Sequence, residues 1–490
     1  MYRHGFDNDR YLAMQSDHIR ERISQFGDKL YLEFGGKLFD DYHASRVLPG
    51  FEPDSKLRML MQLSDQAEIV IVINASDITK NKVRYDLGIT YDVDVLRLVR
   101  LFTDRGLYVS SVVITQYIDL PAVSQFKTKL EKLGIRVYRH YTISGYPSNV
   151  PLIVSDEGFG KNDYIETTKP LVVVTAPGPG SGKMATCLSQ LYHENKRGVK
   201  AGYAKFETFP IWNLPLKHPV NLAYEAATAD LNDVNMIDPF HLEAYGKTTV
   251  NYNRDVEIFP VLTAIFEGIF GECPYKSPTD MGVNMAGLCI VDDDACREAS
   301  CQEIIRRYFQ SLQKAVNDEA AESEAYKIEL IMKQAKITPE DRPVVPTARE
   351  LAHSIDAPAA ALELPDGKII LGKTKELLGA SAAVLLNAIK ELGGIDPELD
   401  LISPEAIAPI QRLKVKYLGS TNPRLHTDEV LIALSTSAAT DENARKALEQ
   451  LPKLRRCQVH TTVLLSDVDV KIFKKLGLDL TSEPVQEEKK

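Results

Sequence analysis

The segment from residue 169 to 208 constrains the fold most, because it joins a strand, a glycine-rich loop, a helix and a second strand. It reads KPLVVVTAPGPGSGKMATCLSQLYHENKRGVKAGYAKFET. An apolar run precedes the loop and an amphipathic pattern follows it, which is the βαβ arrangement of parallel sheets. The segment therefore predicts an α/β fold with a largely parallel sheet.

Helical and strand patterns also alternate through the first 165 residues. Short runs rich in β-branched and aromatic residues recur there, namely KLYLEF, AEIVIVINA, LYVSSVVIT and GIRVYRHY. Continuous apolar runs such as IVIVI are typical of parallel strands that are buried on both faces. After residue 346, a hairpin-like ALELPDGKIIL precedes helices rich in alanine and leucine, which indicates a C-terminal α+β domain.

The length of 490 residues exceeds what one hydrophobic core usually supports, so we expect a multidomain chain. Proline and charge combine in KITPEDRPVVPTARE, which indicates a boundary near residue 340. The predicted parts are an N-terminal α/β domain (1–165), a P-loop-like α/β domain (166–310), a helical connector and linker (311–345), a C-terminal α+β domain (346–480) and a tail (481–490).

Composition narrows the possible partners and the compartment. The net charge of −10 and a pI near 5.6 disfavour a nucleic-acid partner. No apolar stretch approaches the roughly 18 residues of a membrane-spanning helix, and the N-terminus lacks a secretory pattern. The six cysteines are too scattered for a disulfide framework. We expect a cytoplasmic protein without a membrane or nucleic-acid partner, and a homo-oligomer is compatible with the sequence.

The glycine-rich loop resembles the phosphate-binding motif GxxxxGK[ST] but departs from it at two positions. Gly182 and Lys183 occupy the GK positions, whereas Pro177 replaces the first glycine and Met184 replaces the hydroxyl that binds Mg²⁺. Backbone N–H groups can still surround an anion at the helix N-terminus. The residues that would bind the ligand in this way are Gly178, Gly180, Ser181, Gly182, Lys183 and Met184.

Metal binding is less well supported by this loop. A thioether is a poor partner for Mg²⁺, and Thr186 lies roughly 200° around the helix from residue 184. Either Mg²⁺ is held elsewhere, or it reaches the phosphates through water, or hydrolysis has been lost, and the metal ligands stay unknown. A plain glycine–proline turn between strand and helix is the alternative to phosphate binding.

Lys205 and Glu207 are the candidate catalytic residues, because they follow the second strand of the βαβ unit. Ligands of open α/β sheets bind at the carboxyl ends of the strands. We expect Lys205 to stabilise transferring charge and to approach the same phosphate group as the loop, while Glu207 orients a metal or a nucleophile. The alternative is an exposed ion pair, which contributes only about 0–1 kcal/mol to stability.

Four other polar groups have both a functional and a structural interpretation. The first group lies in one segment of the chain and consists of Asn221, Glu225, Asp230, Asp233, Asp238 and His241. Asp292, Asp293 and Asp294 resemble an acidic strand end, but they also suit the cap of a following helix, which we favour. The N-terminal group suits an anion or a charged turn and comprises Lys37, Asp40, Asp41, His43 and Arg46. The C-terminal group is Arg424, His426 and Asp428.

Two resemblances follow from these motifs. TAPGPGSGK, VKAGYAKFETFP and ADLNDVNMIDPFHLEAYG are together similar to the dethiobiotin synthetase branch of P-loop proteins, over roughly residues 170–246. That resemblance implies phosphate binding by Gly182 and Lys183, and it matches Lys205 to a strand-end lysine that faces the substrate and the phosphoryl group. Nearly the whole chain, from GFDNDRYLAMQSDHIRERI to TNPRLHTDEVLIALSTSAAT, resembles a bacterial family described only as a domain of unknown function. That resemblance implies a multidomain protein and no activity.

The sequence therefore favours a protein that binds ATP, another nucleotide or a phosphorylated small molecule at the 177–184 loop. The expected reaction is phosphoryl transfer or ATP-dependent ligation on a small metabolite, as in a phosphotransferase or a ligase. A non-enzymatic sensor or assembly protein with a vestigial P-loop is the alternative. Both would bind the ligand, and only the enzyme would consume it.

Overall fold

The computed structural model describes residues 3–27, 29–36, 38–39, 41–84, 87–316, 318 and 321–487. The chain forms two compact units. The first consists of His4–Tyr224 and Asp233–Arg297, and the second consists mainly of Glu225–Asn232 and the described residues from Glu298 onward. The first unit contains the glycine-rich loop, Lys205 and Glu207.

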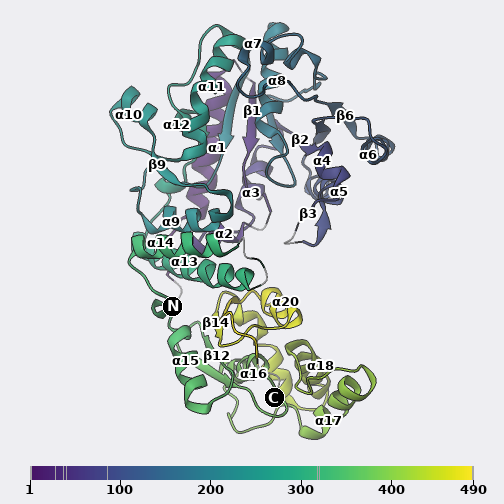
Figure 1. Cartoon of the computed structure of the whole chain (residues 1–490), viewed down its shortest axis with the longest axis vertical. Helices are drawn as coiled ribbons and strands as arrows, with labels where there is room; N and C mark the ends of the chain where they lie inside the picture. Colours follow the sequence, from purple (N-terminus) through teal and green to yellow (C-terminus); the bar gives the residue numbers. More distant parts are fainter. Residues whose placement is uncertain are drawn as a thin grey trace. The chain divides into compact units, whose positions relative to one another are not determined.

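A seven-stranded sheet forms the centre of the first unit (Figure 1). Every pairing recorded between neighbouring strands is parallel. In spatial order the strands are β11 (Gly282–Val283), β8 (Gly202–Phe206), β1 (Leu30–Phe34), β7 (Leu171–Thr175), β2 (Ala67–Asn74), β5 (Val109–Thr115) and β6 (Arg136–Arg139). The structure confirms the α/β class and the largely parallel sheet.

The sequence of the central strands explains why they are buried on both faces. All eight residues of β2 and all five of β7 are buried, as expected for apolar runs without alternation. Glu68 is the charged exception in β2, and its carboxylate accepts the backbone N–H groups of Thr168 (2.6 Å) and Lys169 (2.8 Å). This buried carboxylate fixes the chain just before β7, and thereby the start of the strand that carries the loop.

Two long helices cover one face of the sheet. They are α8 (Lys183–Lys196) and α11 (Asn253–Phe270). Their apolar side chains share one core cluster with Tyr31 of β1, Val172 and Val174 of β7 and Tyr203 of β8. Lys205 lies two residues after Tyr203 on β8 and so points to the same face.

The connections from β1 to β2, β2 to β5 and β5 to β6 all run in one direction across the sheet, and β7 to β8 runs in the other. Because parallel crossovers are right-handed, the first group lies on the face opposite α8. The helices of these connections are α3 (Ser55–Gln62), α5 (Tyr91–Thr103) and α6 (Pro121–Lys132). Helix α1 (Asn8–Gln25) packs against α3.

The strand order differs from the division expected from the sequence. Strands β1, β2, β5 and β6 come from residues 1–165, and β7, β8 and β11 come from residues 166–310, yet all belong to one sheet. The expected boundary at residue 165 therefore does not separate two sheets. Strand β7 inserts between β1 and β2, a long-range pairing that no local pattern encodes.

Smaller elements complete the first unit. Two short antiparallel pairs are β3 (Val83–Arg84) with β4 (Ile89–Thr90) and β9 (Asn235–Ile237) with β10 (Val250–Tyr252). The short helices are α2 (Tyr42–Val47), α4 (Ala75–Thr79), α7 (Val150–Ile153), α10 (Pro239–Tyr245) and α12 (Pro278–Met281), while α9 (Pro219–Ala227) and α13 (Asp293–Ala315) extend into the second unit.

The second unit contains a mixed four-stranded sheet in the order β13-β12-β14-β15 (Figure 1). Strands β12 (Ala359–Glu363) and β13 (Ile369–Lys373) form the antiparallel hairpin that the sequence predicts. Strands β14 (Gln458–Thr461) and β15 (Asp479–Ser482) pair in parallel. The helices are α14 (Glu322–Ala335), α15 (Val344–Ile355), α16 (Ala380–Leu392), α17 (Pro404–Arg412), α18 (Thr427–Ser437), α19 (Glu442–Leu448) and α20 (Asp467–Lys475). This confirms a C-terminal α+β part.

No helix in the described ranges combines the length and the apolar character that crossing a membrane requires.

Candidate functional site

The glycine loop, defined here as residues 176–182, leaves the carboxyl end of β7 and enters α8. Gly180 and Gly182 have φ values of +76° and +90°, which place both in the left-handed region that favours glycine. Ser181 is buried, and its hydroxyl donates to the carbonyl oxygen of Gly178 at 2.9 Å. The loop is therefore a compact turn that ends in the first turn of α8.

Side chains from neighbouring strand ends hold the loop in place. Thr115, the last residue of β5, donates its hydroxyl to the carbonyl oxygen of Ser181 at 2.7 Å. A Cβ atom at Gly178 would clash with the ring and hydroxyl of Tyr91, and one at Gly182 would lie 3.0 Å from Cγ2 of Thr115. Close packing therefore restricts both positions to glycine.

The backbone N–H groups of the loop are available to a ligand. Within the described part of the chain, no acceptor is recorded for the N–H groups of Gly178 or residues 180–185. Lys183 is half-buried, and its ammonium makes no ion pair with any described residue. Free N–H groups at a helix N-terminus and an unpaired lysine are the chemistry of an anion site.

Met184 contributes its backbone to the loop and its side chain to the core. The side chain is half-buried and packs against the apolar cluster between the sheet and α8. No group of three or more His, Cys, Asp or Glu side chains is placed to share a metal ion within the ranges that the structure describes. Because position 184 offers no oxygen, the loop residues do not fit direct coordination of Mg²⁺.

Lys205 lies at the centre of a second polar group, the Lys205 cluster, which comprises Lys205, Glu207, Tyr252 and Asp255. The Lys205 ammonium donates to Oδ2 of Asp255 at 2.5 Å and to the Tyr252 hydroxyl oxygen at 2.8 Å. It also lies 2.9 Å from Oε1 of Glu207. The Tyr252 hydroxyl donates to Oε1 of Glu207 as well. The cluster thus joins the end of β8 to β10 and to the first turn of α11.

Burial makes the charges of the Lys205 cluster interact strongly. The side chains of Lys205 and Asp255 are 10% and 8% exposed, and that of Glu207 is 23% exposed. Burial alone lowers the pKa of Lys205, but the charges of Asp255 and Glu207 outweigh it and raise that pKa. Burial raises the pKa of Glu207, and Asp255 adds to the rise against the opposing charge of Lys205. The exposed surface pair considered from the sequence is therefore excluded.

The glycine loop and the Lys205 cluster lie at the carboxyl ends of two strands that are not neighbours in the sheet. Strand β1 lies between β7 and β8, so the two strand axes are about 10 Å apart. The Lys205 ammonium already has three acceptors for its three protons. The sequence shows that both strand ends face the same edge, but it does not reveal the strand inserted between them.

Glu33 of β1 occupies the space between the two groups. It pairs in register with Lys205 and Val174, and its carboxylate accepts the Tyr203 hydroxyl at 2.7 Å. The charge of Glu33 raises the pKa of Lys205. The pKa of the Cys187 thiol is raised mainly by burial and further by the charge of Glu33, whereas the charge of Lys183 lowers it. Glu33 therefore acts electrostatically on both the loop helix and the Lys205 cluster.

Several other polar residues stabilise local structure. Asn221 is fully buried and exchanges hydrogen bonds with the backbone of Ile211. Asp238 caps α10 by accepting the N–H of His241 at 3.0 Å. Asp292 accepts the N–H of Ala295 at 3.0 Å, which confirms the capping interpretation for the first aspartate.

At that helix start, Asp293 also forms an ion pair with Arg297 and a hydrogen bond with His218. Asp233 pairs with Arg254 at 3.0 Å.

The remaining candidates divide between the two ends of the chain. Lys37 and Asp40 lie outside the described residues. Asp41 pairs with buried Lys56 at 2.7 Å. In the second unit, His426 pairs with Asp469 at 3.0 Å at the start of α18.

His43 packs against Phe209, with ring centroids 5.2 Å apart. Asp428 accepts the N–H of Glu429, and Arg424 pairs with Glu487. These residues show packing or capping roles.

Sequence analysis does not find Tyr252, Asp255 or Glu33 as site residues. Asp255 follows a short strand in the first turn of α11, where an acidic residue usually indicates helix capping. Tyr252 is the last residue of β10, and from the sequence it would be interpreted as an aromatic residue of the core. A signal for Glu33 does exist, because it is the one charged residue in the apolar strand LYLEF.

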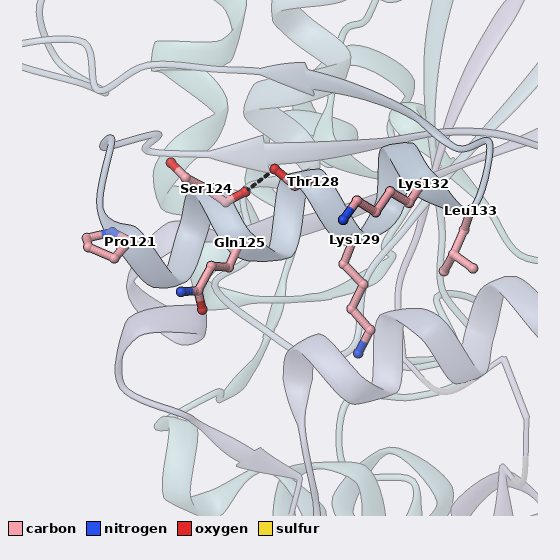
Figure 2. Close-up of a pocket in the computed structure, with 7 residues that line it drawn as sticks. All are labelled: Pro121, Ser124, Gln125, Thr128, Lys129, Lys132 and Leu133. Carbon is pink, nitrogen blue, oxygen red and sulfur yellow. Dashed lines mark hydrogen bonds between the residues drawn. The ribbon is translucent and has the colours of Figure 1, made fainter.

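A pocket lies along α6 (Figure 2). Its lining side chains come from one helix and the residue that follows it, namely Pro121, Ser124, Gln125, Thr128, Lys129, Lys132 and Leu133. None of them belongs to the glycine loop or to the Lys205 cluster. The pocket therefore plays no part in the candidate site.

Family models and curated relatives match almost the whole chain. Residues 4–336 match the model "Domain of unknown function DUF1846, N-terminal", and residues 340–490 match its C-terminal counterpart. A UPF0371 protein of Corynebacterium aurimucosum is 61% identical over 98% of this chain and 97% of its own length. A UPF0371 protein of Streptococcus thermophilus is 58% identical over 99% and 98%, respectively. The chain therefore belongs to the DUF1846 family and contains both its N-terminal and its C-terminal parts.

Proposed function

We propose that this protein binds a nucleotide or another phosphorylated small molecule at residues 178–184 and acts on the rest of that ligand beside Glu207. The proposed reaction is phosphoryl transfer or ATP-dependent ligation on a small metabolite. The observation that carries the proposal is the set of uncommitted backbone N–H groups at the start of α8, next to the unpaired Lys183 ammonium.

The position of the loop in the sheet supports an anion ligand. Ligands of open parallel sheets bind at the carboxyl ends of strands where the connections leave in opposite directions. Strand β7 leads to β8 on one side, and its neighbour β2 leads to β5 on the other. The loop lies at this switch point, so its N–H groups and Lys183 would neutralise a phosphate there.

The separation of the loop from the Lys205 cluster constrains the ligand. With β1 between them, the axes of the strands that carry the two groups are about 10 Å apart, and the Lys205 ammonium already has an acceptor for each of its three protons. The ligand must therefore extend beyond its phosphate, as a sugar phosphate or a nucleotide does. In this proposal Glu207 acts at the distal part of the ligand, while Lys183 contacts the phosphate.

A ligand sensor is the second candidate, and Met184 is the observation that favours it. Most P-loop enzymes place a hydroxyl on Mg²⁺ at this position, and here the side chain packs into the core. A sensor would bind the phosphorylated ligand without consuming it. Product formation from the bound ligand, followed by phosphorus NMR, distinguishes the two.

The proposal is tested by a thermal-shift screen with ATP, sugar phosphates and inorganic pyrophosphate, with and without Mg²⁺. Calorimetry then compares wild type with Lys183→Ala for each compound that stabilises the protein. Loss of the ammonium should weaken binding by about 1.5–3 kcal/mol, or roughly 10-fold to 150-fold.

Lys169→Ala is the matched control. Lys169 precedes the amino end of β7, whereas the loop follows its carboxyl end, and the Lys169 ammonium donates to the carbonyl oxygen of Asp65. Its affinity for the ligand should equal that of wild type. An affinity that Lys183→Ala leaves unchanged would show that the ligand binds elsewhere.

A further inference from the structure

Two carboxylate oxygens of the Lys205 cluster have no recorded partner among the described residues, Oε2 of Glu207 and Oδ1 of Asp255. Oε1 of Glu207 accepts from Tyr252 and faces Lys205, whereas no partner for Oε2 is recorded among the described residues. The Asp255 carboxylate and the Lys205 ammonium are less exposed and contact each other directly. Glu207 is thus the member of the cluster that a ligand can reach.

The charges of the cluster do not balance. Lys205 carries one positive charge, and Asp255 and Glu207 together carry two negative charges when both are ionised. A buried carboxylate without a counter-charge favours its protonated form. Asp255 makes the shorter contact with Lys205, so Glu207 is the carboxylate left in excess.

We propose that Lys205 and Asp255 form a fixed ion pair that positions Glu207 as the proton-exchanging group of the site, with Tyr252 orienting its carboxyl. In its ionised form, Oε2 accepts the proton of a substrate O–H or N–H group, and the electron pair of that bond stays on the substrate atom as the nucleophile. Lys205, Asp255 and Tyr252 are positioning residues. The exchange with a substrate rests on the proposed function, but the protonation behaviour of Glu207 does not.

The groups around Glu207 fix the sign of each expected effect. Asp255 and Tyr252 act on it in opposite directions, because a nearby negative charge raises a carboxyl pKa and a donated hydrogen bond lowers it. The titratable and charged groups that face the cluster are Lys205 from β8, Tyr252 from β10, Arg254 and Asp255 from α11, Tyr224 from α9 and Glu33 from β1.

The test is an infrared titration of the full-length protein without ligand, in which protonated and ionised carboxyl groups have distinct bands. The Glu207 signal is identified by its loss in Glu207→Gln. In wild type it should titrate well above the ordinary glutamate value of about 4.3. Asp255→Asn should lower the midpoint by at least about one pH unit, and Tyr252→Phe should raise it.

Two control variants make matched changes elsewhere. Asp163→Asn removes a carboxylate that pairs with Arg139 of β6, at the opposite edge of the sheet. Tyr275→Phe removes a buried hydroxyl that donates to the Tyr203 carbonyl oxygen. Both should leave the Glu207 midpoint unchanged.

Three results would each overturn the proposal: an ordinary Glu207 midpoint in wild type, an Asp255→Asn midpoint that does not fall, or equal shifts in the controls. If Asp255→Asn does not fold, the wild-type midpoint and the direction of the Tyr252→Phe shift decide alone. The titration needs no ligand, so its failure leaves the phosphate proposal standing. The absence of any phosphorylated ligand would likewise leave this titration unaffected.

Discussion

Gly178 shows how a single residue determines the shape of the loop. A Cβ atom at this position would clash with Tyr91, whereas one at Gly180 would meet nothing within 4 Å. Alanine is therefore unfavourable at the two positions for different reasons, because Gly178 is restricted by a neighbour and Gly180 by its φ of +76°. A second substitution that removes the Tyr91 ring can therefore distinguish the effect of packing at Gly178 from the effect of backbone strain at Gly180.

We predict that Gly178→Ala lowers the free energy of unfolding by about 1–3 kcal/mol, as overpacking does, and weakens phosphate binding. Both losses caused by Gly178→Ala should be smaller when they are measured against Tyr91→Ala, since that background lacks the clashing ring, although Tyr91→Ala itself lowers stability because Tyr91 is buried. In Gly180→Ala the loss of about 1–2 kcal/mol comes from backbone strain, so the Tyr91→Ala background should not reduce it. Denaturant unfolding of wild type, the three single variants and the two double variants gives the two required double-mutant cycles. Purely additive effects in both backgrounds would refute the packing argument.

Lys205 illustrates what a residue-level interpretation of sequence misses. The position at the end of a strand and the neighbouring Glu207 are visible in the sequence, and both residues do lie in one polar cluster. Tyr252 and Asp255 lie 47 and 50 positions further along the chain, respectively, and no spacing rule connects them to Lys205. The role of Lys205 depends on these partners, so the sequence alone could not distinguish a phosphate-binding lysine from a positioning one.

At the scale of elements, the sequence predicts which segments form strands and does not predict their order. The apolar runs of β2, β5 and β7 identify buried parallel strands, and the alternation of strands with helices identifies the α/β class. The insertion of β7 between β1 and β2 is a pairing of segments far apart in the sequence, which no local pattern encodes. That insertion places a strand between the strand that carries the loop and the strand that carries Lys205, and it is the basis for proposing a ligand longer than a phosphate.

The end of β6 provides a test of acid stability. His140 follows this edge strand and is 4% exposed, and its ring nitrogen lies 3.2 Å from the Asp163 carbonyl oxygen. Burial lowers the pKa of His140 to about 4, although the contact with Asp163 opposes this. The folded protein therefore prefers the neutral ring, so its contribution to stability is complete above about pH 6.5 and is lost as the pH falls toward 4.

As the pH is lowered across that window, the free energy of unfolding should decrease in both proteins. The decrease should be smaller in His140→Gln than in wild type, by about 3 kcal/mol. Denaturant titrations at a series of pH values measure the difference. His353→Gln, a substitution of the same type at an exposed histidine of α15, is the control. Identical curves for His140→Gln and wild type would contradict the assignment.

At the scale of the whole molecule, the two compact units and the two family models divide the chain differently. The two family models meet between residues 336 and 340, whereas the second compact unit already contains the chain from Glu298 onward. Helices α13 and α14 therefore belong to the N-terminal family model by sequence, and mostly to the second unit by contacts. The candidate site lies entirely in the first unit, so the binding proposal requires no residue from the second.

The most direct test of the central claim is amide hydrogen exchange of the full-length protein with and without a phosphorylated compound found in the screen. The account predicts new protection at the backbone amides of Gly178 and residues 180–185, because these N–H groups would bind the phosphate. Lys183→Ala should reduce that protection at the same ligand concentration. A ligand that binds without protecting these amides, and protects α6 or another segment in their place, would contradict the account.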